Sequence, residues 1–377
     1  MKPKAIFTTL ISMLLLLCCQ HQIACAQRKT EHVILITLDG LRWQELFTGA
    51  DKGLLEKKHY VTDHTLAQTF WDENIDARRK KLMPFFWNEI ATQGQLYGNR
   101  HMGSKVNCAN PHWFSYPGYS EMLVGFVDRR IHSNRAIQNP NNTVFNFVAA
   151  QPAYKNKVAA FATWEVISAV LGSNKKDMVL NTGHDVATGD ISENEMALNQ
   201  LQAVLKNPHG PRYDTLTFAY AFEYLKRAQP DLLFISFDET DEHGHGGRYD
   251  QYLAAAHRTD QLIQTLWQWI QNNDVYKNKT TLLITTDHGR GNGKRSWKNH
   301  GCLFFGSSEI WFAALGPDTP AVGEVKTNNR YYQKQIAATI GAFLGLHYGN
   351  VRPTGHVIDA MFNSEQYKDM LLSMGAR

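Results

Sequence analysis

Residues 32–40 read HVILITLDG, a strongly apolar and β-branched run that ends in Asp39 and Gly40. A run without polar alternation is typical of a strand covered on both faces, as the strands of a parallel sheet are. Similar runs recur at 157–164, 231–241, 280–289 and 309–316. The pattern therefore predicts a largely parallel central sheet that contains at least these five strands.

Helix-like segments separate many of the apolar runs. They lie at 192–207, 215–229, 251–273 and 331–345. Alternation of strands and helices favours a single α/β domain over residues 27–377, with helices on both faces of the sheet. The segment 48–140 is aromatic and less regular, and we expect it to cap the functional site rather than to form a separate domain.

The first 26 residues have the features of a cleaved secretory signal. Lys2 and Lys4 precede an apolar run at 5–19 that is too short to span a bilayer comfortably. Ala24-Cys25-Ala26 then offers a small–x–small cleavage site. We therefore expect a mature chain that begins near Gln27 and is secreted or periplasmic.

A lipid anchor at Cys25 is less favoured, because Gln22 stands where an aliphatic residue is required, and no later segment is apolar enough to span a membrane. The formal net charge of the whole chain is only +4, and it falls further with the loss of the signal. A balance this close to zero gives no indication of a nucleic-acid polymer or a charged membrane as partner. Cys108 and Cys302 would remain after cleavage, either as a disulfide or as two free thiols.

Three of the predicted strands are followed by residues that can bind metals. Asp39 follows the first strand, Asp241 and His245 follow the third, and Asp287 and His288 follow the fourth. The carboxyl ends of parallel strands share one edge of a sheet, where ligands bind. Because carboxylates and imidazoles are ordinary zinc ligands, we interpret these residues as a candidate metal site.

Each motif also has a simpler interpretation. Asp39-Gly40 can be an ordinary turn, and the acidic stretch 238–250 can be an exposed polar loop. His300 lies in a loop rich in glycine and lysine, where a histidine is usually just exposed. In favour of a site, Gly244 would let the backbone turn tightly and bring Asp241 and His245 to one point.

Two serines are candidates for a nucleophile. Ser115 and Ser120 lie in NPHWFSYPGYSE at 110–121, ahead of a helix predicted over 120–124. A serine there is either a helix cap or a nucleophile whose attacked group meets the positive end of the helix. A serine without a nearby general base needs another means of ionisation, which a metal provides.

Taken together, the motifs resemble those of the alkaline phosphatase superfamily, in its nucleotide pyrophosphatase/phosphodiesterase-like branch. The matching segments, in the family's order, are ITLDG at 36–40, FSYPGYSEMLVG at 114–125, DEHGH at 241–245, TTDHG at 285–289 and NHG at 299–301. Each segment is short, but the ordered set is specific. The resemblance implies an alkaline-phosphatase-like α/β fold with a metal site at the carboxyl ends of the strands.

The resemblance also implies two divalent metal ions, usually zinc. One ion would be held by Asp241, His245 and His300. The other would be held by Asp39, Asp287 and His288 together with the nucleophile. In this branch the nucleophile precedes a residue–Pro pair, which selects Ser115 over Ser120. Two zinc ions would be balanced by the three aspartates and the ionised Ser115, which predicts a neutral resting site.

A phosphoryl oxygen would be bound by Asn134, with Asn139 as a rival, and by backbone N–H groups near Tyr116. Nearby aromatic residues are either pocket-lining or packing side chains: Trp113, Tyr116, Tyr119 and Trp164. Asp238, Glu239, Glu242 and His243 would be surface groups or hydrogen-bond partners of the ligands.

The implied activity is that of an exported phosphoesterase, hydrolysing phosphate mono- or diesters of small molecules through a phosphoseryl intermediate on Ser115. A serine nucleophile favours monoesters, whereas the branch as a whole favours diesters. Cations that would favour a monoester are available in Arg129, Arg130, Lys294 and Arg295.

Three other functions remain open. A sulfatase is less favoured, because Tyr119 stands where the sulfatase signature has arginine. A phosphotransferase or mutase of the same superfamily is the second, and a non-catalytic secreted binding protein that keeps the fold is the third.

Overall fold

The computed structural model describes residues 28–172, 176–205, 207, 210–363 and 367–368. The predicted signal at 1–26 lies outside these residues. Among the helices of the described part of the chain, none is long and apolar enough to cross a membrane.

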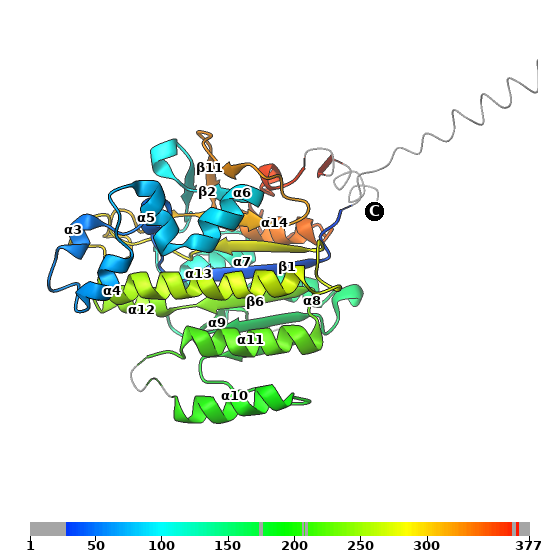
Figure 1. Ribbon diagram of the computed structural model, residues 1–377. Coiled ribbons are helices and arrows are strands. Elements are labelled where there is room, and N and C mark those ends of the chain that lie inside the picture. Colours follow the sequence, from blue (N-terminus) through cyan, green and yellow to red (C-terminus); the bar gives the residue numbers. More distant parts are fainter. Residues whose placement is uncertain (1–27, 173–175, 206, 208–209, 364–366, 369–377) are drawn as a thin grey trace, which may run out of the picture.

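An eight-stranded sheet forms the centre of the molecule, in the order β10-β2-β9-β7-β1-β6-β4-β5 (Figure 1). Its strands are β1 (His32–Leu38), β2 (Gln95–Tyr97), β4 (Val158–Ala162), β5 (Met178–Thr182), β6 (Leu232–Phe237), β7 (Thr280–Thr285), β9 (Phe312–Leu315) and β10 (Gly323–Glu324). The five strands from β7 to β5 are parallel, and Ile36 of β1 lies opposite Ile235 and Ile284. The predicted α/β fold with a largely parallel sheet is confirmed.

The run at 309–316 differs from the prediction. It is divided at Trp311 into β8 (Glu309–Ile310) and β9, and β9 runs antiparallel to β7. β8 joins β3 (Lys105–Asn107) and β11 (Arg330–Tyr332) in a separate three-stranded sheet. Residues 286–308, which connect β7 to β8, contain no helix. A strand that returns without a crossover helix runs antiparallel.

The four predicted helices are present with slightly different bounds, as α10 (Glu193–Val204), α11 (Asp214–Ala228), α13 (Tyr249–Gln271) and α14 (Ile336–Phe343). The segment 48–140 is more helical than expected. It contains α3 (Lys52–Leu55), α4 (His64–Thr69), α5 (Ile75–Leu82), η1 (Phe86–Ile90), α6 (Ala91–Gln93), η2 (Arg100–Met102) and α7 (Ser115–Val124). The other helices are α2 (Trp43–Thr48), α8 (Val144–Ala149), η3 (Pro152–Tyr154), α9 (Ile167–Val170), α12 (Glu239–His245), η4 (Gln333–Gln335) and η5 (Asp359–Met361).

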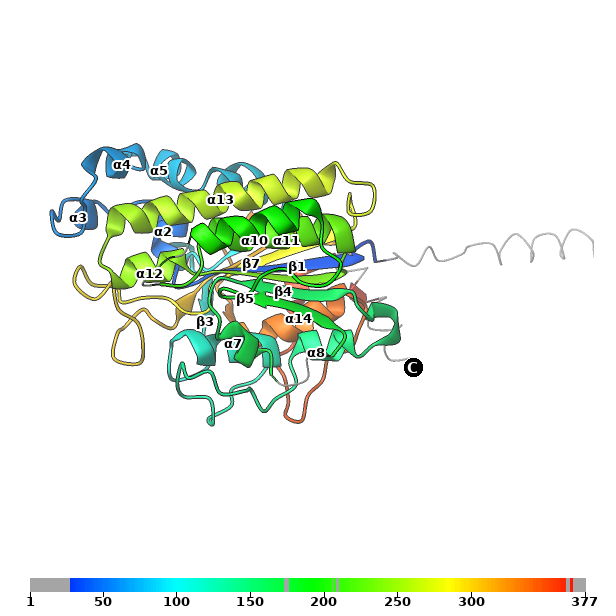
Figure 2. The same ribbon diagram turned by 90° about the horizontal axis from the view of Figure 1, so that it is seen from below.

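Helices cover both faces of the sheet, with α10, α11 and α13 on one side and α7, α8 and α14 on the other (Figure 2). Side chains of a strand point alternately to the two faces. Ile34, Ile36 and Leu38 of β1 therefore pack in the core under α11 and α13. Val33 and Leu35 pack in the second core, with α7, α8 and α14. The continuous apolar run of β1 is explained by these two cores.

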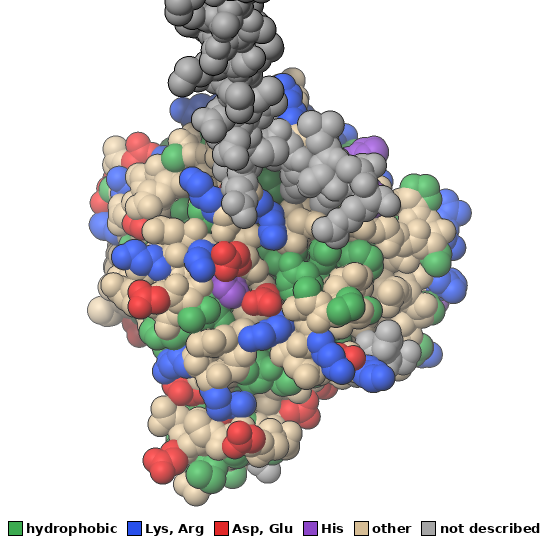
Figure 3. All heavy atoms as spheres, turned by 90° about the vertical axis from the view of Figure 1, so that its right-hand side faces the viewer, with side chains coloured by type: hydrophobic (Ala, Val, Ile, Leu, Met, Phe, Trp, Pro, Cys, Tyr) green, Lys and Arg blue, Asp and Glu red, His purple; other side chains and the backbone are tan. Residues whose placement is uncertain are grey.

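The carboxyl ends of β1, β6 and β7 lie side by side at one edge of the sheet. Leu38 is opposite Phe237, and Thr37 is opposite Thr285. The opposite edge, where β1 begins, belongs to the face seen in Figure 3. Acidic and basic side chains are interspersed on that face. The candidate metal ligands predicted from the sequence follow the carboxyl ends of the strands, at the other edge.

Candidate active site

Seven side chains predicted from the sequence lie together beyond the carboxyl ends of β1, β6 and β7, and His288 is at their centre. Its Nε2 atom lies 3.4 Å from Asp39 Oδ1, 3.3 Å from Asp287 Oδ2 and 3.3 Å from Ser115 Oγ. Asp241 Oδ1 is 3.9 Å from the same nitrogen. Residues far apart in the sequence thus converge, as the strand-end argument predicted.

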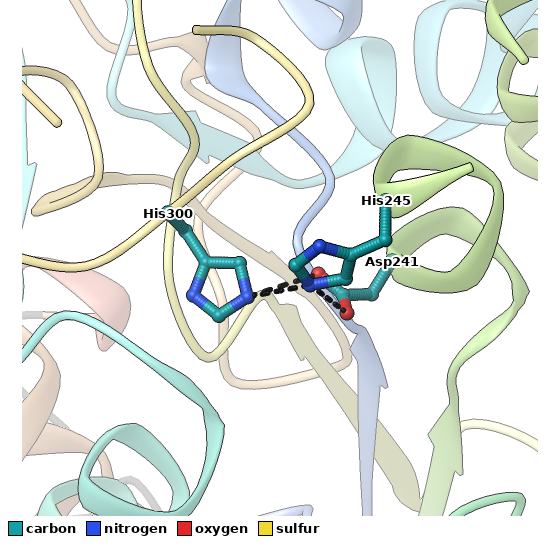
Figure 4. Close-up of side chains that lie close together, drawn as sticks. All are labelled: Asp241, His245 and His300. Atoms are coloured by element: carbon teal, nitrogen blue, oxygen red, sulfur yellow. Dashed lines mark hydrogen bonds and ion pairs between the residues drawn. The ribbon is translucent and has the colours of Figure 1, made fainter. Parts of the chain in front are cut away.

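A second group consists of Asp241, His245 and His300, which are drawn in Figure 4. His245 Nε2 is 3.1 Å from Asp241 Oδ2 and 2.8 Å from His300 Nε2. The His300 ring stacks on that of His288, with ring centroids 3.9 Å apart. His300 is therefore not a free loop residue but links the two groups.

Among the described residues, two sets of ligand atoms are close enough to hold a metal ion. They are Asp241, His245 and His300, and Asp39, Asp241 and His288. Asp241 belongs to both sets, whereas the sequence motifs assigned it to one. Two expected ligands, Asp287 and Ser115, are in neither set. Asp287 approaches His288 through its Oδ2 atom, while its Oδ1 atom accepts a hydrogen bond from Gly40 N–H at 3.1 Å.

Burial makes charge in these groups unfavourable. It raises the pKa of Asp39 well above its ordinary value, and the charges of Asp287 and Asp241 add to the effect. Burial and the charge of Asp241 raise the pKa of Asp287 to about 7. Burial also lowers the pKa of His288 well below its usual value and that of His300 to about 4. Both imidazoles are therefore neutral near pH 7 and available as ligands.

Two buried carboxylate oxygens of the site, Asp39 Oδ1 and Asp287 Oδ2, have no hydrogen-bond partner. A buried acceptor without a donor costs about 1–3 kcal/mol, and more when it is charged. A cation among these atoms would engage both oxygens and counter the repulsion between the aspartates. Carboxylate oxygens and imidazole nitrogens are the ligands that Zn²⁺ takes, so the residues fit an ion of this kind.

Ser115 is the first residue of α7, which begins five residues before the predicted helix at 120–124. Pro117 falls in the first turn of the helix, where its missing N–H group is tolerated. The Ser115 hydroxyl thus lies at the positive end of a ten-residue helix. Ser120 lies inside α7, where its Oγ atom accepts a hydrogen bond from Asn139 at 3.1 Å. Ser120 and Asn139, the two rival candidates, are therefore hydrogen-bonded to each other and belong to neither metal-ligand group.

Asn134 lies beside Ser115, at the start of α7. Its Oδ1 atom accepts a hydrogen bond from the Tyr116 N–H at 2.9 Å. This backbone N–H, expected to bind a phosphoryl oxygen, is therefore engaged already. The side-chain Nδ2 of Asn134 remains as a donor on the wall of the cavity that contains Ser115.

A cavity of about 440 Å³ opens beside the nucleophile. It is lined by Ser115, Asn134, Trp164, Glu165, His184, Gly210, Pro211, Asp238, Asp241 and Glu242. The wall of described residues thus contains four carboxylates and neither lysine nor arginine. The four cations named from the sequence do not line it, and Arg130 is paired with Asp128 instead.

Two residues of the site have roles that the motifs did not assign to them. Tyr119 is buried and donates a hydrogen bond to Asp39 Oδ2 at 3.0 Å, so it orients a candidate ligand rather than lining a pocket. Arg290 is also buried, and its guanidinium is paired with Asp241. The position of Arg290 directly after the DHG motif at 287–289 was the hint that the sequence offered for it.

The role expected of Gly244 is also corrected. Gly244 lies inside α12 rather than in a tight turn. A Cβ atom at this position would lie 2.7 Å from Cζ of Arg290. The glycine is therefore required for space beside the guanidinium, not for backbone freedom.

Cys108 and Cys302, whose state the sequence left open, are both free thiols, the first buried and the second exposed.

A model of the family described as type I phosphodiesterase / nucleotide pyrophosphatase matches residues 50–304. The match covers six of the seven converging residues and begins after Asp39. No curated protein sequence matches the chain.

Solved structures match over most of the chain. Alkaline phosphatase PafA has 10% sequence identity and a TM-score of 0.62, over 90% of this chain and 100% of that one. Murine ectonucleotide pyrophosphatase/phosphodiesterase 5 has 11% identity and a TM-score of 0.55, over 88% and 100% of the two chains. The phosphonate monoester hydrolase of Agrobacterium radiobacter has 13% identity and a TM-score of 0.54, over 88% and 77%. At these identities the likeness establishes the fold alone, and this fold is the one that the resemblance implied.

Proposed function

The chain belongs to the type I phosphodiesterase/nucleotide pyrophosphatase family, and from this premise we propose that it is an exported, metal-dependent hydrolase of phosphodiesters of small molecules. Membership of the family supports a hydrolase of phosphoric ester bonds. The observation that carries the finer assignment is the cavity beside Ser115, whose described wall lacks lysine and arginine.

Two divalent ions, held by the seven converging residues, would lower the pKa of the Ser115 hydroxyl and counter the charge of the phosphoryl group. The remaining tasks are those of the chain itself. The start of α7 and the Asn134 side-chain amide offer a positive dipole and a donor to the non-bridging oxygens. Tyr119 keeps Asp39 in place by its hydrogen bond.

The proposed reaction has two steps. The Ser115 Oγ atom, after losing its proton to solvent, forms a bond to phosphorus, and the bond from phosphorus to the leaving oxygen breaks with its electron pair. Water then forms a bond to phosphorus, and the bond to Ser115 breaks. The products are an alcohol and a phosphate monoester, and Ser115 regains a proton.

The charge of the cavity wall separates diesters from monoesters. A monoester carries up to two negative charges near neutral pH, and a diester carries one. Glu165 and Glu242 lie on the wall in addition to Asp241, and neither is paired with a described basic side chain, whereas burial raises the pKa of Asp238 well above its ordinary value and disfavours its charge. Charges of one sign in a confined space repel a dianion more strongly than a monoanion. The second ester group of a diester also occupies space where a monoester has a charge.

A substrate panel tests the proposal on purified protein with and without chelator. We expect turnover of bis(p-nitrophenyl) phosphate that exceeds turnover of p-nitrophenyl phosphate and p-nitrophenyl sulfate, and that disappears with chelator. The Ser115→Ala variant is expected to lose at least about three orders of magnitude in kcat while it still binds zinc. Full turnover by this variant would contradict the phosphoseryl scheme. Sulfate ester as the best substrate would instead indicate a sulfatase.

Export is a separate part of the proposal. The predicted signal at 1–26 is expected to be removed, and sequencing of the protein's amino terminus after expression in a secreting host measures this directly. A mature protein that keeps Met1 would contradict export, whereas lipid at Cys25 would indicate an exported protein that is anchored to a membrane.

A further inference from the structure

Arg290 is a buried cation in contact with one of the candidate metal ligands, Asp241. Its side chain has no exposed surface, and its Nη1 atom is paired with Oδ1 of Asp241. The Nε atom donates to the carbonyl of Trp297 at 2.9 Å, and the Nη2 atom donates to the carbonyl of Lys298 at 2.5 Å. A buried guanidinium with all three nitrogens engaged is held in one orientation.

The chain makes room for this guanidinium at two glycines. A Cβ atom on Gly40 would lie 2.7 Å from Arg290 Nη1 and equally close to Asp241 Oδ1. A Cβ atom on Gly244 would lie 2.7 Å from Arg290 Cζ. Gly40 lies just after β1, and Gly244 lies in α12. The guanidinium therefore occupies a space formed by two separate segments of the chain.

The carbonyl groups that accept from Arg290 belong to the loop that leads to His300. Gly291 N–H donates to the Asn299 carbonyl at 2.9 Å and closes the base of this loop. Arg290 therefore connects the loop that carries His300 with Asp241 on α12, and it follows His288 by two residues.

The two oxygens of Asp241 have different surroundings. Its Oδ2 atom lies 3.1 Å from His245 Nε2. Its Oδ1 atom lies between the two groups, 3.7 Å from His300 Nε2 and 3.9 Å from His288 Nε2. Without another partner, Oδ1 would be free to bridge both candidate metal positions. Arg290 is the partner that this oxygen has.

We propose that Arg290 is a positioning residue, which engages Asp241 Oδ1 so that the carboxylate binds one ion, beside His245 and His300, through Oδ2 alone. This proposal rests on the proposed function, because it takes Asp241 as a metal ligand. It assigns Asp39, Asp287, His288 and Ser115 to the other ion. It also changes the charge balance, since the guanidinium adds one positive charge to the neutral site expected from the aspartates, the serine and two zinc ions.

Metal binding by the whole protein, stripped with chelator, tests the proposal without reference to activity. Zn²⁺ is added in competition with a chromophoric chelator, and Co²⁺ is added while the visible absorption is recorded. We expect Arg290→Gln to weaken the binding of one equivalent by about 10–100-fold, as changes around metal ligands do, and to change the Co²⁺ spectrum. Arg290→Lys keeps the charge without the planar fork and is expected to recover only part of the affinity.

A matched control is Arg212→Gln. Arg212 is also buried, and its guanidinium donates to the carbonyl of Ala162 at 2.9 Å and to Thr217 Oγ1 at 3.0 Å, away from the candidate ligands. This variant is expected to lower the melting temperature and to leave both zinc affinities unchanged.

A second variant guards against misfolding of Arg290→Gln. Gly244→Ala leaves the arginine in the chain but places a methyl group against its guanidinium, and alanine is the better helix former. We expect the same loss of affinity for one equivalent. Wild-type affinities and an unchanged Co²⁺ spectrum in both variants would overturn the role of Arg290. Failure of the wild type itself to bind metal or to hydrolyse diesters would overturn the proposed function instead.

Discussion

Asp287 occupies a position where its negative charge is unfavourable unless a cation is near. Its side chain is fully buried, its Oδ2 atom has no hydrogen-bond partner, and the charge of Asp241 is close. The neighbouring Asp39 is in the same situation. At the scale of single residues, the site therefore has the electrostatic properties of a cation site, and those properties can be measured on metal-free protein.

The first residue-scale prediction concerns Asp287→Asn under chelator. Because the folded pKa is about 7, above the value near 4 of an unfolded aspartate, the folded state binds the proton more tightly. Metal-free wild type should therefore lose stability as pH rises from about 4 to about 7. Asparagine removes this loss, and its Oδ1 atom can still accept from Gly40 N–H.

The expected result is that metal-free Asp287→Asn is more stable than metal-free wild type above pH 7, on the order of 2–4 kcal/mol. The difference should shrink towards acid and be smallest below pH 4. Urea denaturation at several pH values measures it. A difference that is independent of pH would mean that Asp287 does not carry the expected charge.

The second residue-scale prediction concerns Glu165, which lines the cavity beside Ser115. Replacement by lysine places a cation where the wall is acidic. The ratio of kcat/KM for an aryl phosphate monoester to that for the matching diester should rise by about tenfold, which corresponds to about 1.4 kcal/mol. Glu165→Gln is the control and should give a smaller rise. An unchanged ratio in both variants would show that wall charge does not select the substrate.

At the scale of elements, the strands that carry the ligands were predictable, whereas the first half of α7 and the whole of α12 were not. β1, β6 and β7 are buried on both faces, so their apolar runs are continuous and their ends are clear. α7 begins with Ser115, Tyr116, Pro117 and Gly118, a composition that indicates a loop by local propensity. Local patterns cannot reveal that Gly118 of this segment packs against the backbone of Asp287, which follows β7.

α12 gives a second example of the same limit. Its sequence, ETDEHGH, has no helical pattern. The backbone N–H groups of Asp238 and Glu239 at its start donate to the buried carboxylate of Asp214, at 2.9 and 3.1 Å. Asp214, which caps the helix in this way, lies 24 residues before Asp238 and 25 residues before Glu239. The pair of Asp241 and Arg290, 49 residues apart, was hidden for the same reason.

An element-scale prediction concerns the packing of α7 on the end of β7. A Cβ atom on Gly118 would lie 2.4 Å from the carbonyl oxygen of Asp287. Gly118→Ala should therefore lower the free energy of unfolding by roughly 1–3 kcal/mol, although alanine gains about 1 kcal/mol of helix propensity. It should also reduce diester turnover more than tenfold, because Ser115 shifts relative to His288.

Gly53→Ala is the control for this prediction. Its new Cβ would meet the flexible end of the Lys294 side chain, so stability and turnover should change little. Urea denaturation and kcat are measured for both variants. Equal behaviour of the two would mean that contact with Asp287 does not position α7.

At the scale of the whole molecule, the site joins segments from most of the chain. The converging residues run from Asp39 to His300, and they follow β1, β6 and β7 or begin α7. Sequence patterns could predict this convergence because parallel strands share a carboxyl edge. They could not predict the antiparallel β9, since the direction of a short apolar run depends on the connection before it.

Metal removal gives the prediction at this scale. Each ion bound only to the folded state stabilises it by about 4 kcal/mol when its free concentration exceeds its Kd by 1,000-fold. With an unfolding entropy of about 2.1 cal/mol/K per residue, a chain of this size should melt roughly 5 °C lower for each ion removed by chelation and recover when Zn²⁺ is restored. His245→Ala, which removes one ligand of the set containing His300, should show a smaller shift. Calorimetry with and without Zn²⁺ measures both, and equal melting temperatures of wild type in the two conditions would mean that the converging residues hold no ion.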